Sequence, residues 1–331
     1  MLSKFCQRSE PEHCNTIPRT VQYKQIDIEG WANYVSNVKA GFDLREQVQG
    51  SRLFPQLKKL YNLRLFRLLS EFLEFGLIAP GFSVTWQTKR ADVLGLIKKL
   101  RPQNCGKELI RIGTGGDGGY LVPDDLDGIE YCFSPGVNTV SDFENQIADR
   151  GIKSFLADYS VDQPPIMRPE FTFDKKFLGA TNNDKFFTLA SWKEKYLKDY
   201  SGDLILQMDI EGAEYEVILN APDELLNQFR ILVIEFHSLE RLFDPIYFRL
   251  FSSCFEKLLK PFCVVHIHPN NFYGCVKRGN LEIPRFMEFT LLNRKRIGST
   301  SPVRTFPNSL DVKNVPHRKN IRLPECWYED I

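Results

Sequence analysis

The chain has 331 residues, a formal net charge of +1 at pH 7 and 43% hydrophobic residues. That hydrophobic fraction supports a sizeable packed core and argues against a disordered chain. The near balance of basic and acidic residues gives no basic footprint of the kind that nucleic-acid-binding proteins carry, so we expect no nucleic-acid partner. The length suggests one large domain with an appendage, or two domains.

The eight cysteines contain no Cys-x-x-Cys pair, which argues against a zinc ribbon or a redox motif. Cys132 and Cys263 fall inside apolar runs, where a free cysteine behaves as a small hydrophobic residue. A reducing compartment, and hence a cytoplasmic location, is therefore expected. The first ten residues lack the apolar core of a secretory signal, and no apolar run reaches the roughly 18 residues that would suggest a membrane span.

Two helices are predicted near the amino terminus. Over residues 54–78 large apolar side chains recur at spacings of three and four, which is helical periodicity, and the apolar face is wide. Such a helix should dock on the main domain or form a homodimer interface. A second helix is predicted over 88–100, ended by Pro102. We therefore expect residues 1–105 to form a helical arm.

Residues 113–120 contain five glycines. The segment lacks the Gly-Lys-Ser/Thr of a P-loop and does not fit Gly-x-Gly-x-x-Gly at the start of a helix. A tight β-hairpin bend and a loop that lies close to a ligand are both compatible with it.

A βαβ unit is predicted over residues 130–158. A strand over 130–134 leads into a turn at 135–138, a helix over 141–150 and a second strand over 152–157 that ends in Asp158. An acid at that strand end can accept hydrogen bonds from a ribose diol, as in dinucleotide-binding folds. The turn has the single glycine Gly136, which leaves little room for a pyrophosphate and favours a nucleoside ligand without a diphosphate.

The remaining chain continues the alternation of strands and helices. Strands are predicted over 171–178, 204–208, 230–236, 262–268 and 286–292, with helices from 192, from 214 and over 245–259. The strand over 204–208 is a short run rich in Leu and Ile without polar alternation, which is typical of a strand covered on both faces. It is followed by Asp209, Glu211 and Glu214, either as a ligand site at the sheet edge or simply as acids in the first turn of a helix.

The segment Met208-Asp-Ile-Glu-Gly-Ala-Glu-Tyr-Glu-Val217 resembles the signature of the FkbM-type S-adenosylmethionine-dependent methyltransferases. Residues 177–179, 188–189 and 264–270 stand at spacings similar to those of that family, and the resemblance covers roughly 108–295. It implies an α/β fold with a Rossmann-like class I methyltransferase sheet of seven strands, the last antiparallel, over 106–296. It also implies methyl transfer from S-adenosyl-L-methionine, usually to a hydroxyl group of a sugar, glycan or natural product.

The resemblance also implies a cofactor site. Gly136 would pass under the methionine moiety, Asp158 would hold the ribose, and Ser134 and Asp209 would complete the pocket. The loop Ser134-Pro-Gly-Val137 is poorer in glycine than the usual first-strand turn of the family.

Methylation of a hydroxyl group requires a base or a metal ion that acidifies the hydroxyl. His237, His266 and His268 stand at or just after predicted strand ends, and His266 and His268 share one side of their strand. We expect His237, His268 and Asp209 to be catalytic, the alternative for each histidine being a structural role.

Asp209, Glu235 and His237 follow adjacent strands and are predicted to share Mg²⁺ or Mn²⁺. A rival hypothesis is a metal-dependent glycosyltransferase that uses Asp209-Ile-Glu211, although it leaves Asp158 unexplained. A second is a non-catalytic Rossmann-like scaffold, since the turn at 134–137 is irregular. Residues 297–331 are rich in proline, arginine and asparagine and are predicted to run over the surface as a tail.

Overall fold

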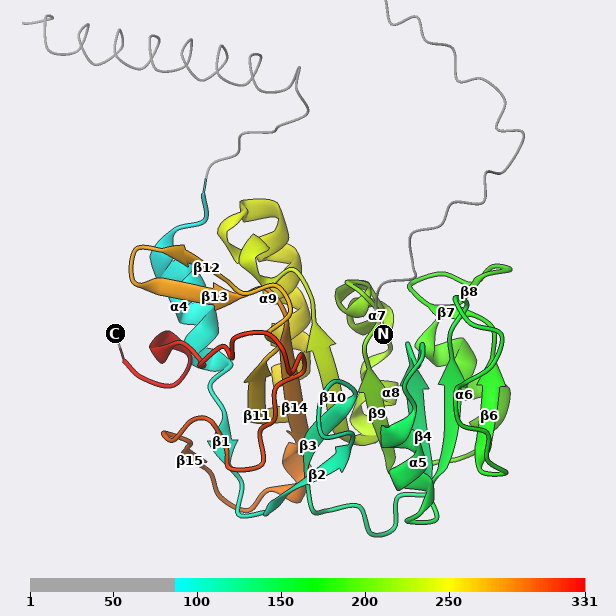
Figure 1. The fold of residues 1–331 in the computed structure, drawn as a ribbon. Helices are drawn as coiled ribbons and strands as arrows, with labels where there is room; N and C mark the ends of the chain where they lie inside the picture. Colours follow the sequence, from blue (N-terminus) through cyan, green and yellow to red (C-terminus); the bar gives the residue numbers. More distant parts are fainter. Residues whose placement is uncertain (1–86, 331) are drawn as a thin grey trace, which may run out of the picture. The chain divides into compact units, whose positions relative to one another are not determined.

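A seven-stranded sheet carries the fold (Figure 1). The computed structural model describes residues 87–330. The helix predicted over 54–78, and with it the expected dimer interface, lies outside the described residues.

The strands lie in the order β11-β14-β10-β9-β4-β5-β6. Neighbouring strands are parallel except for β14, which is antiparallel to both β10 and β11. Their bounds are Phe262–Pro269 for β11, Met287–Asn293 for β14, Phe229–Phe236 for β10, Leu204–Met208 for β9, Tyr131–Pro135 for β4, Lys153–Ala157 for β5 and Phe171–Asp174 for β6. The predicted fold, a sheet of seven strands with the last one antiparallel, is confirmed.

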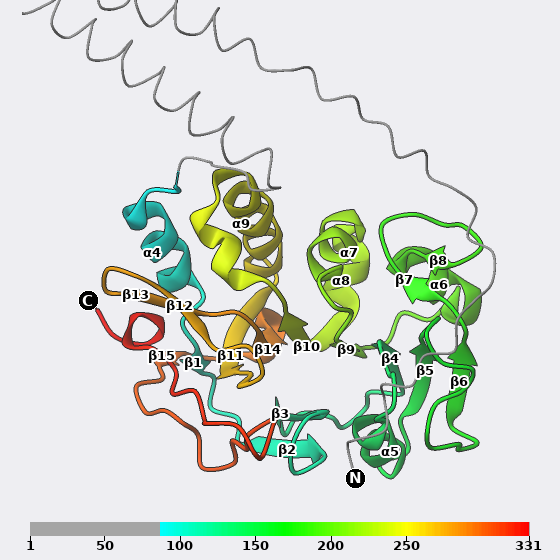
Figure 2. The ribbon, with the colours of Figure 1, turned by 45° about the horizontal axis from the view of Figure 1, so that its top comes forward.

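Helices cover both faces of the sheet (Figure 2). One face carries α4 (Arg90–Lys99), α6 (Leu189–Leu197), α7 (Glu214–Asn220), α8 (Asp223–Gln228) and α9 (Pro245–Leu259). The other face is covered by α5 (Asp142–Ala148) and by the hairpin of β2 (Leu109–Gly113) and β3 (Gly119–Pro123). No helix among residues 87–330 has the length and apolar character needed to cross a membrane.

Each face of the sheet has its own core. Every residue of β9, β10, β11 and β14 is buried, which explains why these strands are mostly apolar and show no regular polar alternation in the sequence. The larger core, under the five helices, is rich in aromatic side chains, including Phe133, Trp192, Phe236 and Phe289. The smaller core lies under the hairpin and α5.

The glycine-rich segment forms the bend of the β2–β3 hairpin, in which Gly113 pairs with Gly119. Gly113 has φ +99°, and a Cβ atom there would lie 2.3 Å from the carbonyl oxygen of Gly118, so only glycine fits. Thr290 Oγ1 on β14 donates a hydrogen bond of 2.6 Å to the Leu121 carbonyl and holds the hairpin on the sheet. The structure confirms the hairpin bend, and Asp117 and Gly118 of the bend line a cavity, so the interpretation as a loop close to a ligand stays a prediction.

The prediction of one strand over 171–178 is wrong, because β6 ends at Asp174 and a separate β7 (Phe177–Leu178) pairs with β8 (Phe186–Phe187). The backbone turns at Asp174, where the Lys176 N–H donates to the Asp174 carbonyl at 2.8 Å. The Asp174 carboxylate accepts a hydrogen bond of 3.0 Å from Trp192 Nε1 and fixes the turn against α6.

The carboxyl-terminal segment does more than cross the surface. The hairpin β12 (Cys275–Arg278) and β13 (Leu281–Pro284) meets the short helix η3 (Glu325–Trp327), and β1 (Gln103–Asn104) pairs with β15 (Ser301–Pro302). Trp327 is fully buried, and its Nε1 donates a hydrogen bond of 3.2 Å to the Glu282 carbonyl. The proline-rich composition of residues 297–331 predicts a chain that runs over the surface. The large apolar area of the Trp327 indole ring instead favours burial of the end of this segment in the core.

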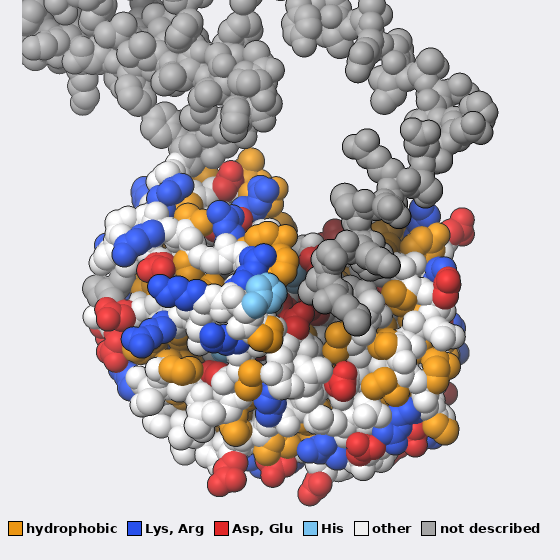
Figure 3. All heavy atoms as spheres, viewed as in Figure 1, with side chains coloured by type: hydrophobic (Ala, Val, Ile, Leu, Met, Phe, Trp, Pro, Cys, Tyr) orange, Lys and Arg blue, Asp and Glu red, His pale blue; other side chains and the backbone are white. Residues whose placement is uncertain are grey.

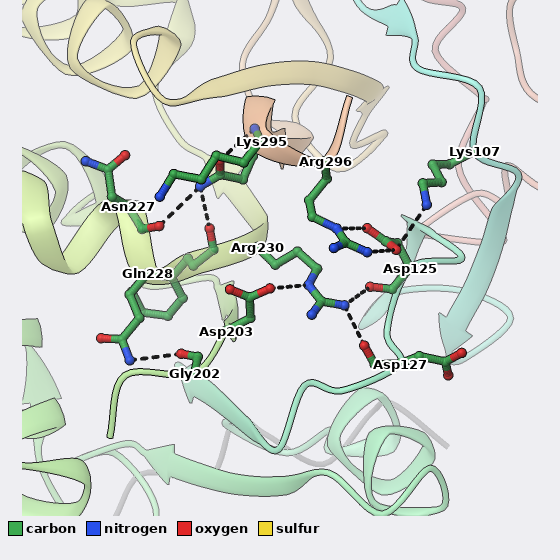
Figure 4. A network of polar contacts seen from close by, with 12 residues as sticks. Lys107, Asp125, Asp127, Gly202, Asp203, Asn227, Gln228, Arg230, Lys295 and Arg296 are labelled. Carbon is green, nitrogen blue, oxygen red and sulfur yellow. Dashed lines mark hydrogen bonds and ion pairs between the residues drawn. The ribbon is translucent and has the colours of Figure 1, made fainter. Parts of the chain in front are cut away.

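Arg230, a buried residue at the start of β10, links the amino-terminal ends of the strands to a neighbouring loop through hydrogen bonds (Figure 4). Arg230 Nε donates to Asp203 at 2.7 Å, and its NH1 donates to the carbonyl oxygens of Asp125 and Asp127 at 2.9 and 2.7 Å. Arg296 and Lys107 in turn donate to the Asp125 carboxylate. The network joins the start of β10 to the loop after β3 and to the end of β14.

We predict that Arg230→Met lowers the free energy of unfolding by about 2–4 kcal/mol, because buried carbonyl oxygens lose a charged donor. Urea denaturation measures the change. The control is Arg249→Met, since Arg249 is exposed on α9. Equal stability of the two variants would contradict the role of the network.

Candidate active site

A cavity of about 590 Å³ opens at the carboxyl ends of β4, β5 and β9. The strand order reverses at β4, which has β5 on one side and β9 on the other. Open α/β sheets bind their ligands beside such a reversal. The lining includes Gly136 after β4, Asp158 after β5 and Asp209 after β9, so three of the predicted site residues meet there. Asp117 of the hairpin bend also lines the cavity.

Gly136 is required by a close approach of the backbone. It has φ +89°, and a Cβ atom would lie 1.7 Å from the carbonyl oxygen of Asp209. Its N–H donates to the Ala157 carbonyl at 2.8 Å, and the Asp209 N–H donates to the Pro135 carbonyl at 3.4 Å. The ends of the three strands are therefore joined through the backbone at this glycine.

Asp158 is 4% exposed and partly satisfied by its own loop. Its Oδ2 accepts from the Asn138 N–H at 2.8 Å, while Oδ1 accepts from the N–H and the hydroxyl of Ser160 at 2.7 and 2.6 Å. A carboxylate offers about four lone-pair positions. Room for a ligand donor therefore remains on the carboxylate, whose position and rotamer are fixed.

Below the cavity lies a buried polar group that the sequence did not reveal. Glu144 of α5 lines the cavity, and its Oε1 is hydrogen-bonded to Ser134, whose Oγ lies 2.6 Å from Gln207 Oε1. Glu144 Oε2 is buried without a hydrogen-bond partner among the described residues. Burial raises the pKa of Glu144 to about 7, although the hydrogen bond from Ser134 opposes the shift. The predicted residue Ser134 thus supports Glu144.

The acidic motif after β9 forms a loop that is held from inside. Glu211 and Gly212 have φ values of +57° and +110°. The carboxylate of Glu214, which is 0% exposed, accepts hydrogen bonds of 3.1 Å from the N–H groups of both Ile210 and Gly212. Glu214 therefore fixes the loop that presents Asp209 and Glu211.

His237, just after β10, is the partner of this loop. Its Nδ1 lies 3.0 Å from Glu214 Oε1, and its Nε2 faces Asp209 Oδ1 at 3.7 Å and Glu211 Oε2 at 3.6 Å. Burial lowers the pKa of His237, but the hydrogen bond and charge of Glu214, with the charges of Asp209 and Glu211, outweigh burial and raise it to about 9. The imidazole is thus positively charged at neutral pH.

For the pKa of Asp209, burial outweighs the neighbouring opposite charge, whereas for His237 the neighbouring charges outweigh burial. Burial raises its pKa and the charge of His237 lowers it, and the net result is a pKa of about 7. Its side chain keeps 28% of its surface exposed, so it remains accessible from the cavity. The structure therefore brings Asp209 and His237 together as predicted.

The other two predicted residues have different hydrogen-bond or ion-pair partners, although Glu235 is close enough to Asp209 for the charge of that residue, after burial, to raise the pKa of Glu235. Glu235 is 3% exposed, and its Oε1 accepts a hydrogen bond of 2.9 Å from Asn270. His268 faces the carboxyl-terminal segment, with Nδ1 3.6 Å from Asp311, and His266 Nε2 lies 2.9 Å from the same carboxylate. Of the predicted catalytic and metal-binding residues, Asp209 lines the cavity, whereas Glu235, His237 and His268 are not among its lining residues.

Residues 157–256 match the model of the methyltransferase FkbM domain. The matched range contains Asp158, the acidic motif and His237, and it confirms the resemblance that the sequence motif indicated. No curated protein matches the chain.

Two solved structures are similar to part of the chain. The first is the fibrillarin/Nop5p complex, at 14% identity over 51% of this chain and 74% of that chain, with a TM-score of 0.32. The second is a putative DNA modification methyltransferase encoded within a prophage (E. coli), at 10% identity over 50% of this chain and 47% of that chain, with a TM-score of 0.31.

We predict that Glu214→Gln lowers the pKa of His237, because the largest favourable charge is removed from beside Nδ1. The measurement is an NMR titration of the imidazole in the presence of a chelator. The control is Glu216→Gln, since Glu216 is exposed on the same helix. An unchanged midpoint in Glu214→Gln would contradict the assignment.

The same shift predicts a dependence of stability on pH. The pKa of His237 is about 6.5 in the unfolded chain and about 9 in the folded protein, so between these pH values only the folded state keeps the imidazole protonated. The free energy of unfolding therefore falls as the pH rises through this window. The contribution is complete below the window. Urea denaturation at several pH values should show this slope in the wild type and a weaker slope in His237→Gln.

Proposed function

We propose that this chain, whose residues 157–256 match the methyltransferase FkbM domain, is an S-adenosyl-L-methionine-dependent methyltransferase that methylates a hydroxyl group of a sugar or natural product. The observation that carries the proposal is the convergence of Gly136, Asp158 and Asp209 on one cavity at the point where the strand order reverses.

The residues of the cavity fit the cofactor. Its volume lies within the roughly 300–1,000 Å³ of small-molecule sites. Glu144 Oε2 is a buried acceptor without a partner within residues 87–330 and suits the α-ammonium group of the methionine moiety. Asp158 suits the ribose hydroxyls, and Phe177 and Leu178 supply an apolar wall for the adenine ring.

The bound cofactor supplies an electrophilic methyl group. The protein must then align the acceptor hydroxyl and remove its proton. Asp209 is our candidate for the base that accepts this proton, because it lines the cavity and its pKa of about 7 is matched to neutral pH. His237, charged at neutral pH and 3.7 Å away, positions this carboxylate and stabilises its anionic form. His268 is a weaker candidate, since it faces Asp311 instead.

An aromatic surface beside His237 supports a sugar acceptor. The centroid of the Phe286 ring lies 4.5 Å from that of the His237 ring and 4.8 Å from that of Tyr273. The ring centroids of Tyr273 and Phe272 are 4.5 Å apart. Tyr273 is 56% exposed and Phe272 is 38% exposed. Flat rings with an apolar face, next to charged hydrogen-bonding groups, suit a ligand that is apolar on one side and hydroxylated at its edge.

We predict that Asp158→Asn weakens S-adenosylmethionine binding by roughly ten- to a hundredfold, because a charge-assisted hydrogen bond to ribose is worth about 1.5–3 kcal/mol. Equilibrium dialysis with labelled cofactor measures the affinity. Asp162→Asn is the control, since the Asp162 side chain is 91% exposed. Unchanged affinity in a folded Asp158→Asn protein would refute the ribose assignment.

Replacement of the proposed base should affect turnover far more than cofactor binding. Asp209→Asn is expected to lower the rate of methyl transfer to a panel of sugars by roughly 10²–10⁴. His268→Gln should retain turnover close to the wild type. Wild-type turnover in Asp209→Asn together with a large loss of turnover in His268→Gln would instead assign the base to His268, at the end of β11.

A further inference from the structure

Three side chains with metal-binding groups meet at the wall of the cavity. One ligand atom from each of Asp209, Glu211 and His237 lies within 4.8 Å of the other two. Figure 3 shows acidic side chains recessed near the centre of the drawn face, with several basic side chains beside them. Two carboxylates and one imidazole form an oxygen-rich donor set of the kind that binds Mn²⁺ or Mg²⁺.

We propose that Asp209, Glu211 and His237 bind one divalent cation, Mn²⁺ or Mg²⁺. Binding of the ion stands on these residues alone, whereas its role in the reaction rests on the proposed function. The ligand set differs from the sequence expectation in that Glu211 replaces Glu235.

The orientation of His237 is the first reason. The residue is 4% exposed, and Nδ1 is held 3.0 Å from the buried carboxylate of Glu214. In metal sites a ligating histidine almost always binds a carboxylate or carbonyl through its other ring nitrogen, which fixes the ring and the tautomer. Nε2 then points between Asp209 and Glu211 at 3.7 and 3.6 Å, distances too long for hydrogen bonds. A buried nitrogen is thus aimed into the gap between two carboxylates. Because a ligating imidazole must be neutral, binding of the cation would release the Nε2 proton to solvent.

The second reason is the loop that carries the carboxylates. Asp209 and Glu211 flank Ile210, whose N–H is held by Glu214, so the same buried carboxylate fixes the loop and the imidazole. Glu211 has an 84% exposed side chain and can adjust its carboxylate to an ion. Two carboxylates opposite one imidazole also leave an excess of negative charge, which a divalent cation balances.

Glu235 does not share this geometry. Its Oε1 accepts a hydrogen bond from Asn270 and its Oε2 is buried without a partner among the described residues, but the ligand atoms that lie within 4.8 Å of one another belong to Asp209, Glu211 and His237. An ion held by the donor group would border the cavity, because Asp209 and Glu211 line it. A hydroxyl group bound to such an ion becomes more acidic, which is the change that an acceptor alcohol requires.

The test is Mn²⁺ binding to the full chain without cofactor or acceptor, followed by electron paramagnetic resonance and calorimetry. The wild type should bind one Mn²⁺. Glu211→Gln and His237→Gln should weaken binding more than tenfold, and Glu214→Gln by about 10–100-fold because the imidazole loses its orientation. Glu235→Gln and the exposed Glu216→Gln should bind as the wild type does. Circular dichroism confirms that each variant is folded.

Two results would overturn the inference: no Mn²⁺ binding by the folded wild type, or a Glu211→Gln variant that binds as tightly as the wild type. A chain that binds S-adenosylmethionine but no Mn²⁺ would refute the metal site and leave the proposed function standing. A chain that binds Mn²⁺ with the expected mutational pattern but no S-adenosylmethionine would support the site and refute the function.

Discussion

The site depends on one buried carboxylate. Glu214 has no exposed surface, and its Oε1 accepts from two N–H groups of the loop after β9 and lies 3.0 Å from the imidazole of His237 after β10, while its Oε2 is buried without a hydrogen-bond partner among the described residues. Removal of that carboxylate would leave buried donors without an acceptor, which costs more than one ordinary hydrogen bond is worth. Glu214 therefore fixes the distance between Asp209 and His237. The contact of Gly136 with the Asp209 carbonyl extends this constraint to β4, so the cavity is shaped by the backbone before any ligand arrives.

Much of the fold could be predicted from the sequence. The buried strands are rich in Leu, Ile, Val and Phe without regular polar alternation, and their chain order with intervening helices indicates a mostly parallel sheet. The convergence of Gly136, Asp158 and Asp209 was predictable for the same reason, since the carboxyl ends of parallel strands share one edge. The burial of Trp327 was not, because nothing local distinguishes it from a surface aromatic residue.

The sequence does not reveal the roles of the two buried glutamates that support the site from within helices. Glu144 and Glu214 both stand in the first turn of a helix, where acids are favoured whatever their role. The choice of Glu211 over Glu235 depends on the positive φ of the motif loop and on the hydrogen bond from Asn270, and both are tertiary features. The position of His268 is set by Asp311 across 43 residues of chain, and spacing along the sequence cannot report such a contact.

The most direct test of the account is titration calorimetry of the full wild-type chain with S-adenosylmethionine and, separately, with a nucleotide sugar. A cavity with one glycine turn, an acid after β5 and a buried carboxylate oxygen that no described residue satisfies should bind S-adenosylmethionine at one site per chain and show no heat of binding with the nucleotide sugar. Binding of the nucleotide sugar instead, or of neither ligand by a folded chain, would contradict the assignment of the cavity.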